Sequence, residues 1–268
     1  MSATKPAIDH ATSHGNALAG ASVLITRPAG TARALAAQVR ARGGVPLLLP
    51  GLSLRNEHDP ALARRLHDGR FDDWIFSSPA AVRACFELAP NLRLSRSARA
   101  FAVGAGTGRA LARHRIEALA PTAGADSEAL LALPELARLR GRHVALLCAP
   151  GGRNLIAPAL RARGAQLEIL HVYQRRAPRL DRRHLKALEA AAAPWITLLS
   201  SAEALDHLCA LLPVALAARW RAQPLIVASE RLAGLARGHG FVDVTLARSA
   251  MGSDLLEGAA RWLARHRL

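Results

Sequence analysis

The sequence contains little cysteine and few aromatic residues, and both shortages narrow what the protein can be. Three cysteines occur in 268 residues, at Cys85, Cys148 and Cys209. Their odd number and wide spacing exclude a disulfide framework and any CxxC metal or redox pair, so we interpret them as small core residues. Four Trp, five Phe and one Tyr are the only aromatic side chains, a low supply for stacking on nucleic-acid bases.

Long apolar runs are also missing. The longest, near 208–218, is interrupted by Pro213 and falls short of the ~20 residues that cross a bilayer. Residues 1–20 contain one Lys, two His and no apolar stretch, so they do not resemble a signal peptide. We therefore expect a cytoplasmic protein whose residues 1–20 form a disordered extension.

Negative charge is scarce relative to positive charge. Lys and Arg total 36 against 20 Asp and Glu, which gives a formal net charge of +16, and every positive residue except Lys5 and Lys186 is Arg. This excess indicates an anionic partner, although an Ala- and Arg-rich composition that follows genome base composition would also produce it. Because Arg is spread over nearly every expected helix, the pattern favours a small polyanion over nucleic acid.

Short apolar runs alternate with Ala/Leu/Arg segments of helical period after the first twenty residues. Most runs are followed by a turn signal and an amphipathic helix, and the runs are continuous rather than alternating, which is typical of a parallel sheet covered on both faces. The sequence therefore predicts a doubly wound α/β fold. The expected strands are 22–26, 45–49, 74–77, 100–103, 144–147, 167–172, 196–200, 225–228 and 242–246.

An internal repeat predicts two similar domains. Residues 23–25 recur as 144–146, and Ser77-Ser78 before a helix recurs as Ser200-Ser201 before a helix, about 120 residues later in each case. Two further pairs of segments follow in the same order. Taken alone, this repeat suggests a boundary near residue 140 and a cleft between the domains.

Glycines and hydroxyl residues follow many of the expected strands. Helix N-termini at such turns present free N–H groups to anions, so together these turns describe several carboxylate or phosphate sockets, although helix capping explains each Ser or Thr taken singly. The candidate binding residues are Arg27, Ser77, Ser78, Gly104, Thr107, Gly151, Gly152, Ser200, Ser201 and Ser229.

Common catalytic motifs are missing from the sequence. It lacks a GxSxG elbow, HExxH, GxxxxGK[ST] and an acidic cluster for magnesium, and we expect neither a metal nor a cofactor. The single tyrosine, Tyr173, follows an expected strand and precedes Arg175-Arg176. It is either a packing residue with a solvated hydroxyl or a functional group at a domain crossover.

An ordered set of segments between about 21 and 263 resembles the uroporphyrinogen-III synthase family. Each segment is degenerate alone, and the ordered set is specific. The segments are VLITRPAG, RARGG, LLLPGL, DDWIFSSPAAV, AFAVGAGTGRAL, GRHVALLCAPGGRNLIAPALRARGAQLEILHVYQRR, LLSSAEAL, PLIVASERLAGLARGHGF and GSDLLEGA.

The resemblance implies two flavodoxin-like domains joined by two crossover strands. The first domain would combine 20–51 with 174–268, and the second would be the insert 52–173, which replaces the simpler boundary near 140. The implied activity is a cofactor-independent hydro-lyase that closes linear hydroxymethylbilane to uroporphyrinogen III in haem biosynthesis. A cytoplasmic monomer is expected, with transient contact with neighbouring pathway enzymes and with no nucleic-acid or membrane partner.

The resemblance also implies roles for individual residues. Tyr173 matches the family's tyrosine after the crossover strand and would assist departure of the substrate's hydroxyl group. Thr107 matches the threonine of the family's VGxxT turn, and the serine pairs at 77–78 and 200–201 match its hydroxyl turns, as contacts to the substrate's carboxylates.

Two turns depart from the family's pattern. Cys148-Ala149-Pro150 stands where many members have Arg-Gly, and Ser229-Glu230-Arg231 where some have Gly-Pro-Thr-Thr. A second function class stays open beside the enzyme: a non-catalytic sensor or adaptor for small anions on the same scaffold. A nucleic-acid binder is the third.

Overall fold

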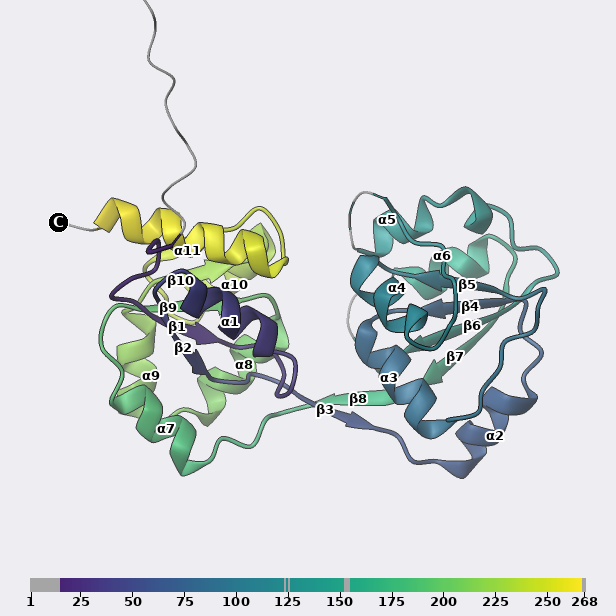
Figure 1. The fold of residues 1–268 in the computed structure, drawn as a ribbon, viewed down its shortest axis with the longest axis horizontal. Coiled ribbons are helices and arrows are strands. Elements are labelled where there is room, and N and C mark those ends of the chain that lie inside the picture. The colour runs from purple at the N-terminus through teal and green to yellow at the C-terminus, as the bar shows by residue number, and fades with distance from the viewer. Residues whose placement is uncertain (1–14, 123, 125, 152–154, 267–268) are drawn as a thin grey trace, which may run out of the picture. The chain divides into compact units, whose positions relative to one another are not determined.

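The computed structural model describes residues 15–122, 124, 126–151 and 155–266. The chain divides into two compact units (Figure 1). Unit 1 combines Met1–Ser53 with Arg176–Leu268, and unit 2 is Leu54–Arg175. The chain therefore leaves unit 1, builds all of unit 2, and returns.

Unit 1 is a five-stranded parallel sheet with helices on both faces. The strands lie in the order β11-β10-β9-β1-β2, and Leu24 of β1 pairs with Leu47 on one side and Thr197 on the other. Successive residues of β1 point to opposite faces: Leu24 packs in one core cluster, whereas Val23 and Ile25 pack in another. The strands are β1 (Ser22–Ile25), β2 (Val45–Leu48), β9 (Trp195–Leu199), β10 (Leu225–Val227) and β11 (Val244–Leu246).

The helices of unit 1 contribute to those two clusters separately. Leu35 of α1 and Leu255 of α11 pack with Val23 and Ile25 on one face. Leu205 of α8 and Trp220 of α9 pack with Leu24 on the other, which makes the sheet doubly wound. The helices are α1 (Arg33–Ala41), α7 (Arg182–Glu189), α8 (Ala202–Leu211), α9 (Val214–Arg221), α10 (Glu230–Gly238) and α11 (Gly252–His266).

Unit 2 repeats this plan with a four-stranded parallel sheet in the order β5-β4-β6-β7. Phe76 of β4 packs with Val82 of α3 in one cluster, and Ile75 packs with Leu160 of α6 in the other. The strands are β4 (Asp73–Phe76), β5 (Arg99–Ala102), β6 (His143–Cys148) and β7 (Gln166–His171), and the helices are α2 (Pro60–Asp68), α3 (Pro79–Leu88), α4 (Ala105–Ala112), α5 (Ser127–Leu131), the 3₁₀ helix η1 (Pro134–Leu136) and α6 (Ile156–Ala162).

Two further strands carry the chain between the units. β3 (Ser53–Asn56) and β8 (Tyr173–Arg176) pair only with each other (Figure 1). The side chain of Gln174, in β8, donates a hydrogen bond to Glu57, the residue after β3, at 2.5 Å. The expected fold class, two doubly wound α/β domains joined by two crossover strands, is confirmed.

The prediction of a disordered extension over residues 1–20 is wrong around Leu18, which is folded onto unit 1. Leu18 is completely buried, and its N–H donates to the carbonyl of Arg42 at 2.8 Å. Burial of this apolar side chain against Val23 and Val39 ties the segment to the core of unit 1. Residues 1–14 of the expected extension lie outside the described residues.

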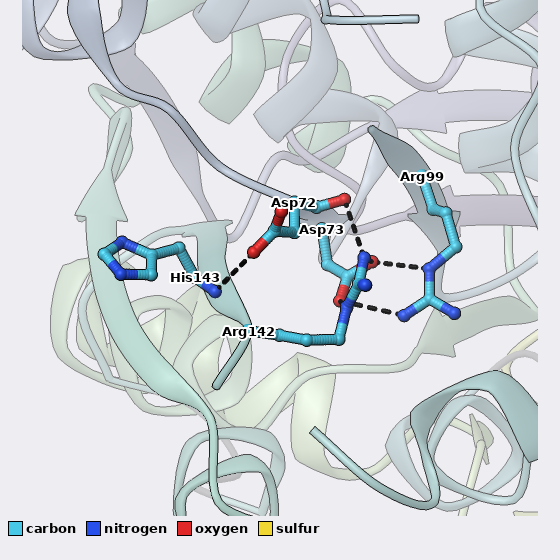
Figure 2. A network of polar contacts seen from close by, with 5 residues as sticks. All are labelled: Asp72, Asp73, Arg99, Arg142 and His143. Carbon is cyan, nitrogen blue, oxygen red and sulfur yellow. Dashed lines mark hydrogen bonds and ion pairs between the residues drawn. The ribbon is translucent and has the colours of Figure 1, made fainter. Parts of the chain in front are cut away.

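A buried carboxylate joins the starting ends of three strands in unit 2 (Figure 2). Asp73, at the start of β4, is 0% exposed. It accepts two hydrogen bonds from Arg99 of β5, at 2.7 and 3.0 Å, and further ones from Arg142 beside β6. Burial raises the pKa of the Asp73 carboxyl, but the hydrogen bonds and charges of Arg142 and Arg99 outweigh it and hold that pKa below its usual range.

We expect Asp73→Asn to destabilise the protein by about 3 kcal/mol at pH 7, because it leaves two arginines facing a neutral amide. The wild-type contribution should be complete above the unfolded-state pKa of about 4 and should be lost as pH falls through the lower folded-state value. Urea unfolding of both proteins at neutral and acidic pH would measure this difference, which should shrink with acidification.

Glu168→Gln is the matched control, since it removes the ion pair between Glu168 and Arg65 in the same unit. The Arg65 side chain is 49% exposed and that of Glu168 is 32% exposed. That pair should contribute at most about 1 kcal/mol. Equal losses in the two variants would contradict the assignment of Asp73 as the stabilising charge.

Candidate functional site

Unit 2 contains a pocket of about 640 Å³ at the carboxyl ends of its strands. This is the edge at which parallel α/β sheets bind ligands. The pocket is lined by polar residues after β4, at the ends of β6 and β7, on β8 and at the start of α5. These polar lining residues are Ser77, Ser78, Asp126, Ser127, Cys148, His171, Tyr173 and Arg175.

The turn after β4 supplies two hydroxyls to the pocket. Phe76 ends the strand and Pro79 begins α3, so Ser77 and Ser78 occupy the short connection. Ser78 is the N-cap of α3, and its Oγ accepts the N–H of Ala81 at 3.1 Å. The capping thus occurs as expected, and Ser78 lines the pocket at the same time.

Tyr173 begins β8 and reaches the same turn. Its side chain packs in the core cluster of unit 2 with Val172 and Ala149 and is 6% exposed. The phenol oxygen lies 3.1 Å from Ser78 Oγ, a hydrogen-bonding distance at which either hydroxyl can donate. Tyr173 is therefore a core residue that also lines the pocket, with its hydroxyl within hydrogen-bonding distance of the turn after β4.

The last residues of β6 and β7 place a thiol and an imidazole together. Cys148 and His171 are register partners on β6 and β7, and the Sγ to Nδ1 distance is 3.6 Å. Burial raises the pKa of the Cys148 thiol to about 11, against a smaller lowering by the charge of Arg175. The thiol is thus protonated at neutral pH, and the pair is not an activated nucleophile.

Gly151 and Arg175 form the remaining polar wall. Gly151 has a φ of +74°, which an L side chain rarely adopts. A Cβ there would lie 3.4 Å from an Nη of Arg175, which donates to the carbonyl of Pro150 at 3.0 Å. The glycine lets the guanidinium lie against the turn, so the pocket contains a fixed positive charge. Gly152 lies outside the described residues.

Gly104 and Thr107 belong to the same unit but do not line this pocket. Gly104 is the N-cap of α4 and its carbonyl accepts the N–H of Thr107 at 2.9 Å. Thr107 is 4% exposed. These two residues follow β5, which is the neighbour of β4 in the sheet.

The other expected residues lie in unit 1, again after adjacent strands. Arg27 follows β1 and donates to the carbonyl of Ala250 at 3.0 Å, and burial lowers the pKa of its guanidinium. Ser201 and Ser229 are the N-caps of α8 and α10. Ser200 begins the connection that Ser201 ends, and it is exposed. Because β1, β9 and β10 are consecutive in a parallel sheet, these turns share one edge of unit 1.

The predicted site residues do not include five of the pocket's polar residues, which are Asp126, Ser127, Cys148, His171 and Arg175. Cys148 was interpreted as a core residue, yet it sits at the last position of β6, where a side chain reaches the binding edge. Its strand-end position was the available signal. Nothing local marked His171, whose place depends on the register of β7 against β6.

Within the described residues, no three His, Cys, Asp or Glu side chains are grouped closely enough to hold a metal ion. No helix among the described residues has the length and apolar character needed to span a membrane. The polar groups of the pocket are hydroxyls, the side chain of Asp126, one guanidinium and a thiol–imidazole pair, beside the N-terminus of α3.

Comparison with known proteins assigns the chain to a family. A family model described as uroporphyrinogen-III synthase HemD matches residues 33–257. The uroporphyrinogen-III synthase of Salmonella typhimurium is 35% identical over 249 residues, which cover 88% of this chain and 98% of that protein. The chain belongs to the uroporphyrinogen-III synthase family. The Escherichia coli enzyme is 33% identical over 243 residues, with the same coverage.

Solved structures of uroporphyrinogen-III synthases share the fold. The Helicobacter pylori protein aligns with a TM-score of 0.62 at 15% identity, over 90% of this chain and 99% of that one. The Thermus thermophilus protein, in a mutant form, aligns with a TM-score of 0.58 at 22% identity, over 92% of this chain and 100% of that one. The expected family resemblance is confirmed.

We predict that Cys148 resists alkylation. With a thiol pKa of about 11, about one molecule in a thousand carries the thiolate at pH 8, so iodoacetamide should react roughly a hundredfold more slowly than with a free cysteine. The rate should rise with pH up to about 11. Mass spectrometry of the peptide that contains Cys148 measures the rate, and the urea-unfolded protein is the control. Equal rates in the folded and unfolded protein would contradict the assigned environment.

Proposed function

We propose that this chain catalyses the uroporphyrinogen-III synthase reaction, closing hydroxymethylbilane to uroporphyrinogen III with loss of water and inversion of the last pyrrole ring. The observation that carries the proposal is sequence identity of 35% with a uroporphyrinogen-III synthase, over 98% of that protein's length. Identity over the whole length means that both units and both crossover strands have counterparts in the relative.

The substrate's own pyrrole rings drive this reaction, so it needs few catalytic groups from the protein. A pyrrole nitrogen of the substrate expels the terminal hydroxyl and leaves an electrophilic azafulvene. The substituted carbon of the last ring attacks it, and the resulting spiro intermediate fragments and closes again at the other carbon. The enzyme must hold one conformer and stabilise charge, which positioned dipoles and hydrogen-bond donors do.

Tyr173 is the group that we assign to the departing hydroxyl. The phenol gives its proton to the leaving oxygen, so that water departs, and the proton released when the last pyrrole regains aromaticity returns to the phenolate. Support comes from its position: Tyr173 lines the pocket, and its phenol oxygen is hydrogen-bonded to Ser78.

Helix N-termini and guanidinium groups are assigned to the substrate's carboxylates. Free N–H groups and the helix dipole favour anions at the first turns of α3, α4, α8 and α10. The proposed contacts are Arg27, Ser77, Ser78, Gly104, Thr107, Gly151, Gly152, Ser200, Ser201 and Ser229. Arg175 joins this set because it lines the pocket.

We assign the reaction to the cytoplasm and to a monomer without a cofactor. Cys85, Cys148 and Cys209 are free thiols, which suits a reducing compartment.

The proposed enzymatic activity is tested by incubating the purified protein with enzymatically generated hydroxymethylbilane and separating the oxidised isomers. Formation of the type III isomer supports it. A sensor or adaptor would leave only the spontaneous type I isomer.

We expect Tyr173→Phe to lose type III formation by ~10²- to 10⁴-fold, the usual cost of removing one general acid. The melting temperature should change little, because the buried ring is retained and only a hydroxyl is deleted. Isomer analysis and a thermal melt of the same preparation measure both quantities. Wild-type activity in the folded variant would remove Tyr173 from the mechanism, and joint loss of fold and activity would leave it a packing residue.

A further inference from the structure

We propose that Ser78 is a positioning residue for Tyr173: its hydroxyl donates to the phenol oxygen and thereby keeps the phenol's own proton available to the pocket. The proposal rests on the proposed function, in which Tyr173 protonates the leaving hydroxyl. It assigns the single proton of the Ser78 hydroxyl to Tyr173, in place of a contact with a substrate carboxylate.

The geometry places three groups in a short chain. The N–H of Ala81, in the first turn of α3, donates to Ser78 Oγ at 3.1 Å. The same Oγ lies 3.1 Å from the phenol oxygen of Tyr173. Tyr173 is 6% exposed, so little water competes for its hydroxyl on the side that faces α3.

A count of hydrogens favours one direction for the bond between the two hydroxyls. A serine hydroxyl has one proton and two lone pairs, and the amide of Ala81 occupies one lone pair. If Ser78 donates to Tyr173, its proton is used and the phenol's proton stays free. If Tyr173 donates instead, Ser78 Oγ accepts two hydrogen bonds and the serine proton needs another acceptor. The phenol proton is then bound to Ser78 and is not available to the substrate.

Electrostatics favour the same direction. α3 is ten residues long, and its N-terminus carries partial positive charge. A hydroxyl that accepts an N–H becomes a stronger donor through cooperative polarisation. Ser78 thus transmits the potential of the helix N-terminus to the phenol oxygen, which gains negative charge as its proton leaves.

This role predicts an effect on turnover rather than on binding. A carboxylate contact contributes to the bound substrate and to the transition state alike, so its loss raises KM. A donor to the phenol acts when the phenol loses its proton, so its loss lowers kcat. The split between kcat and KM therefore separates the two roles of Ser78.

A direct test uses the fact that Tyr173 is the single tyrosine. The tyrosine Fermi doublet of the Raman spectrum reports whether a phenol accepts or donates a hydrogen bond, and here it reports one residue. We expect the intensity ratio of an acceptor in the wild type and a lower ratio in Ser78→Gly. A wild-type ratio typical of a donor, or no change in Ser78→Gly, would overturn the proposal. This readout needs no substrate, so it stands even if Tyr173 proves dispensable for turnover.

Kinetics complete the test. Ser78→Gly removes the hydroxyl and keeps an acceptable N-cap with little loss of stability. It should lower kcat about tenfold, the usual effect of losing one hydrogen bond, with KM nearly unchanged. Ser78→Thr restores the donor and should restore kcat. In a Tyr173→Phe background, Ser78→Gly should cause no further loss. A rise in KM alone, or an undiminished effect in that background, would contradict positioning.

Asp59→Gly is the matched control for capping. Asp59 is the N-cap of α2 in the same unit and accepts the N–H of Ala61 at 2.8 Å, outside the pocket's lining. It should lose stability comparable to that of Ser78→Gly and keep wild-type kcat. A similar fall of kcat in Asp59→Gly would show that loss of a cap, rather than loss of the donor, slows turnover.

Discussion

The carboxylate of Asp73 connects the beginnings of three strands, and the position of the pocket depends on that connection. Two arginines hold it with fixed geometry, Arg99 at the start of β5 and Arg142 before β6 (Figure 2). Parallel strands that are aligned at one end also end at a common level, so Ser77, Val103 and Cys148, each one residue beyond an aligned trio, lie at the opposite edge. The charge lies at the far ends of the strands from the binding edge and competes with no ligand there.

The sequence predicted the layers of the fold because a buried parallel strand leaves a local trace, a short continuous apolar run. It predicted the wrong boundary when the repeat was used alone. The strand at 23–25 matches the one at 144–146, and Ser77-Ser78 matches Ser200-Ser201. Yet unit 1 pairs the first strand with β9, and unit 2 pairs β6 with β4. Each unit thus takes strands from both copies, and only long-range pairing and the β3–β8 crossing reveal this exchange.

The difference between local sequence patterns and long-range pairing also explains which pocket residues could be predicted. Ser77 and Ser78 were predictable because a hydroxyl between a buried strand and a helix caps that helix, and capping leaves the residue at the binding edge. Tyr173 was predictable as the single tyrosine at an expected crossover. His171 and Arg175 were not, since their positions depend on the register of β7 against β6 and on the φ of +74° at Gly151, which only the folded chain fixes.

Stability and chemistry share atoms in this pocket. The N–H of Ala81 is a donor that α3 cannot satisfy internally, so a side-chain acceptor before the helix stabilises the fold whether or not a substrate binds. A hydroxyl is the acceptor that retains a proton to give, whereas a carboxylate in that position would cap the helix equally well and repel both the phenolate and an anionic substrate. Folding alone therefore permits Ser or Asp at position 78, and under the role proposed for Tyr173 the neighbouring phenol favours the hydroxyl. Two caps of similar stability are thus distinguished at this position by the chemistry proposed for the pocket.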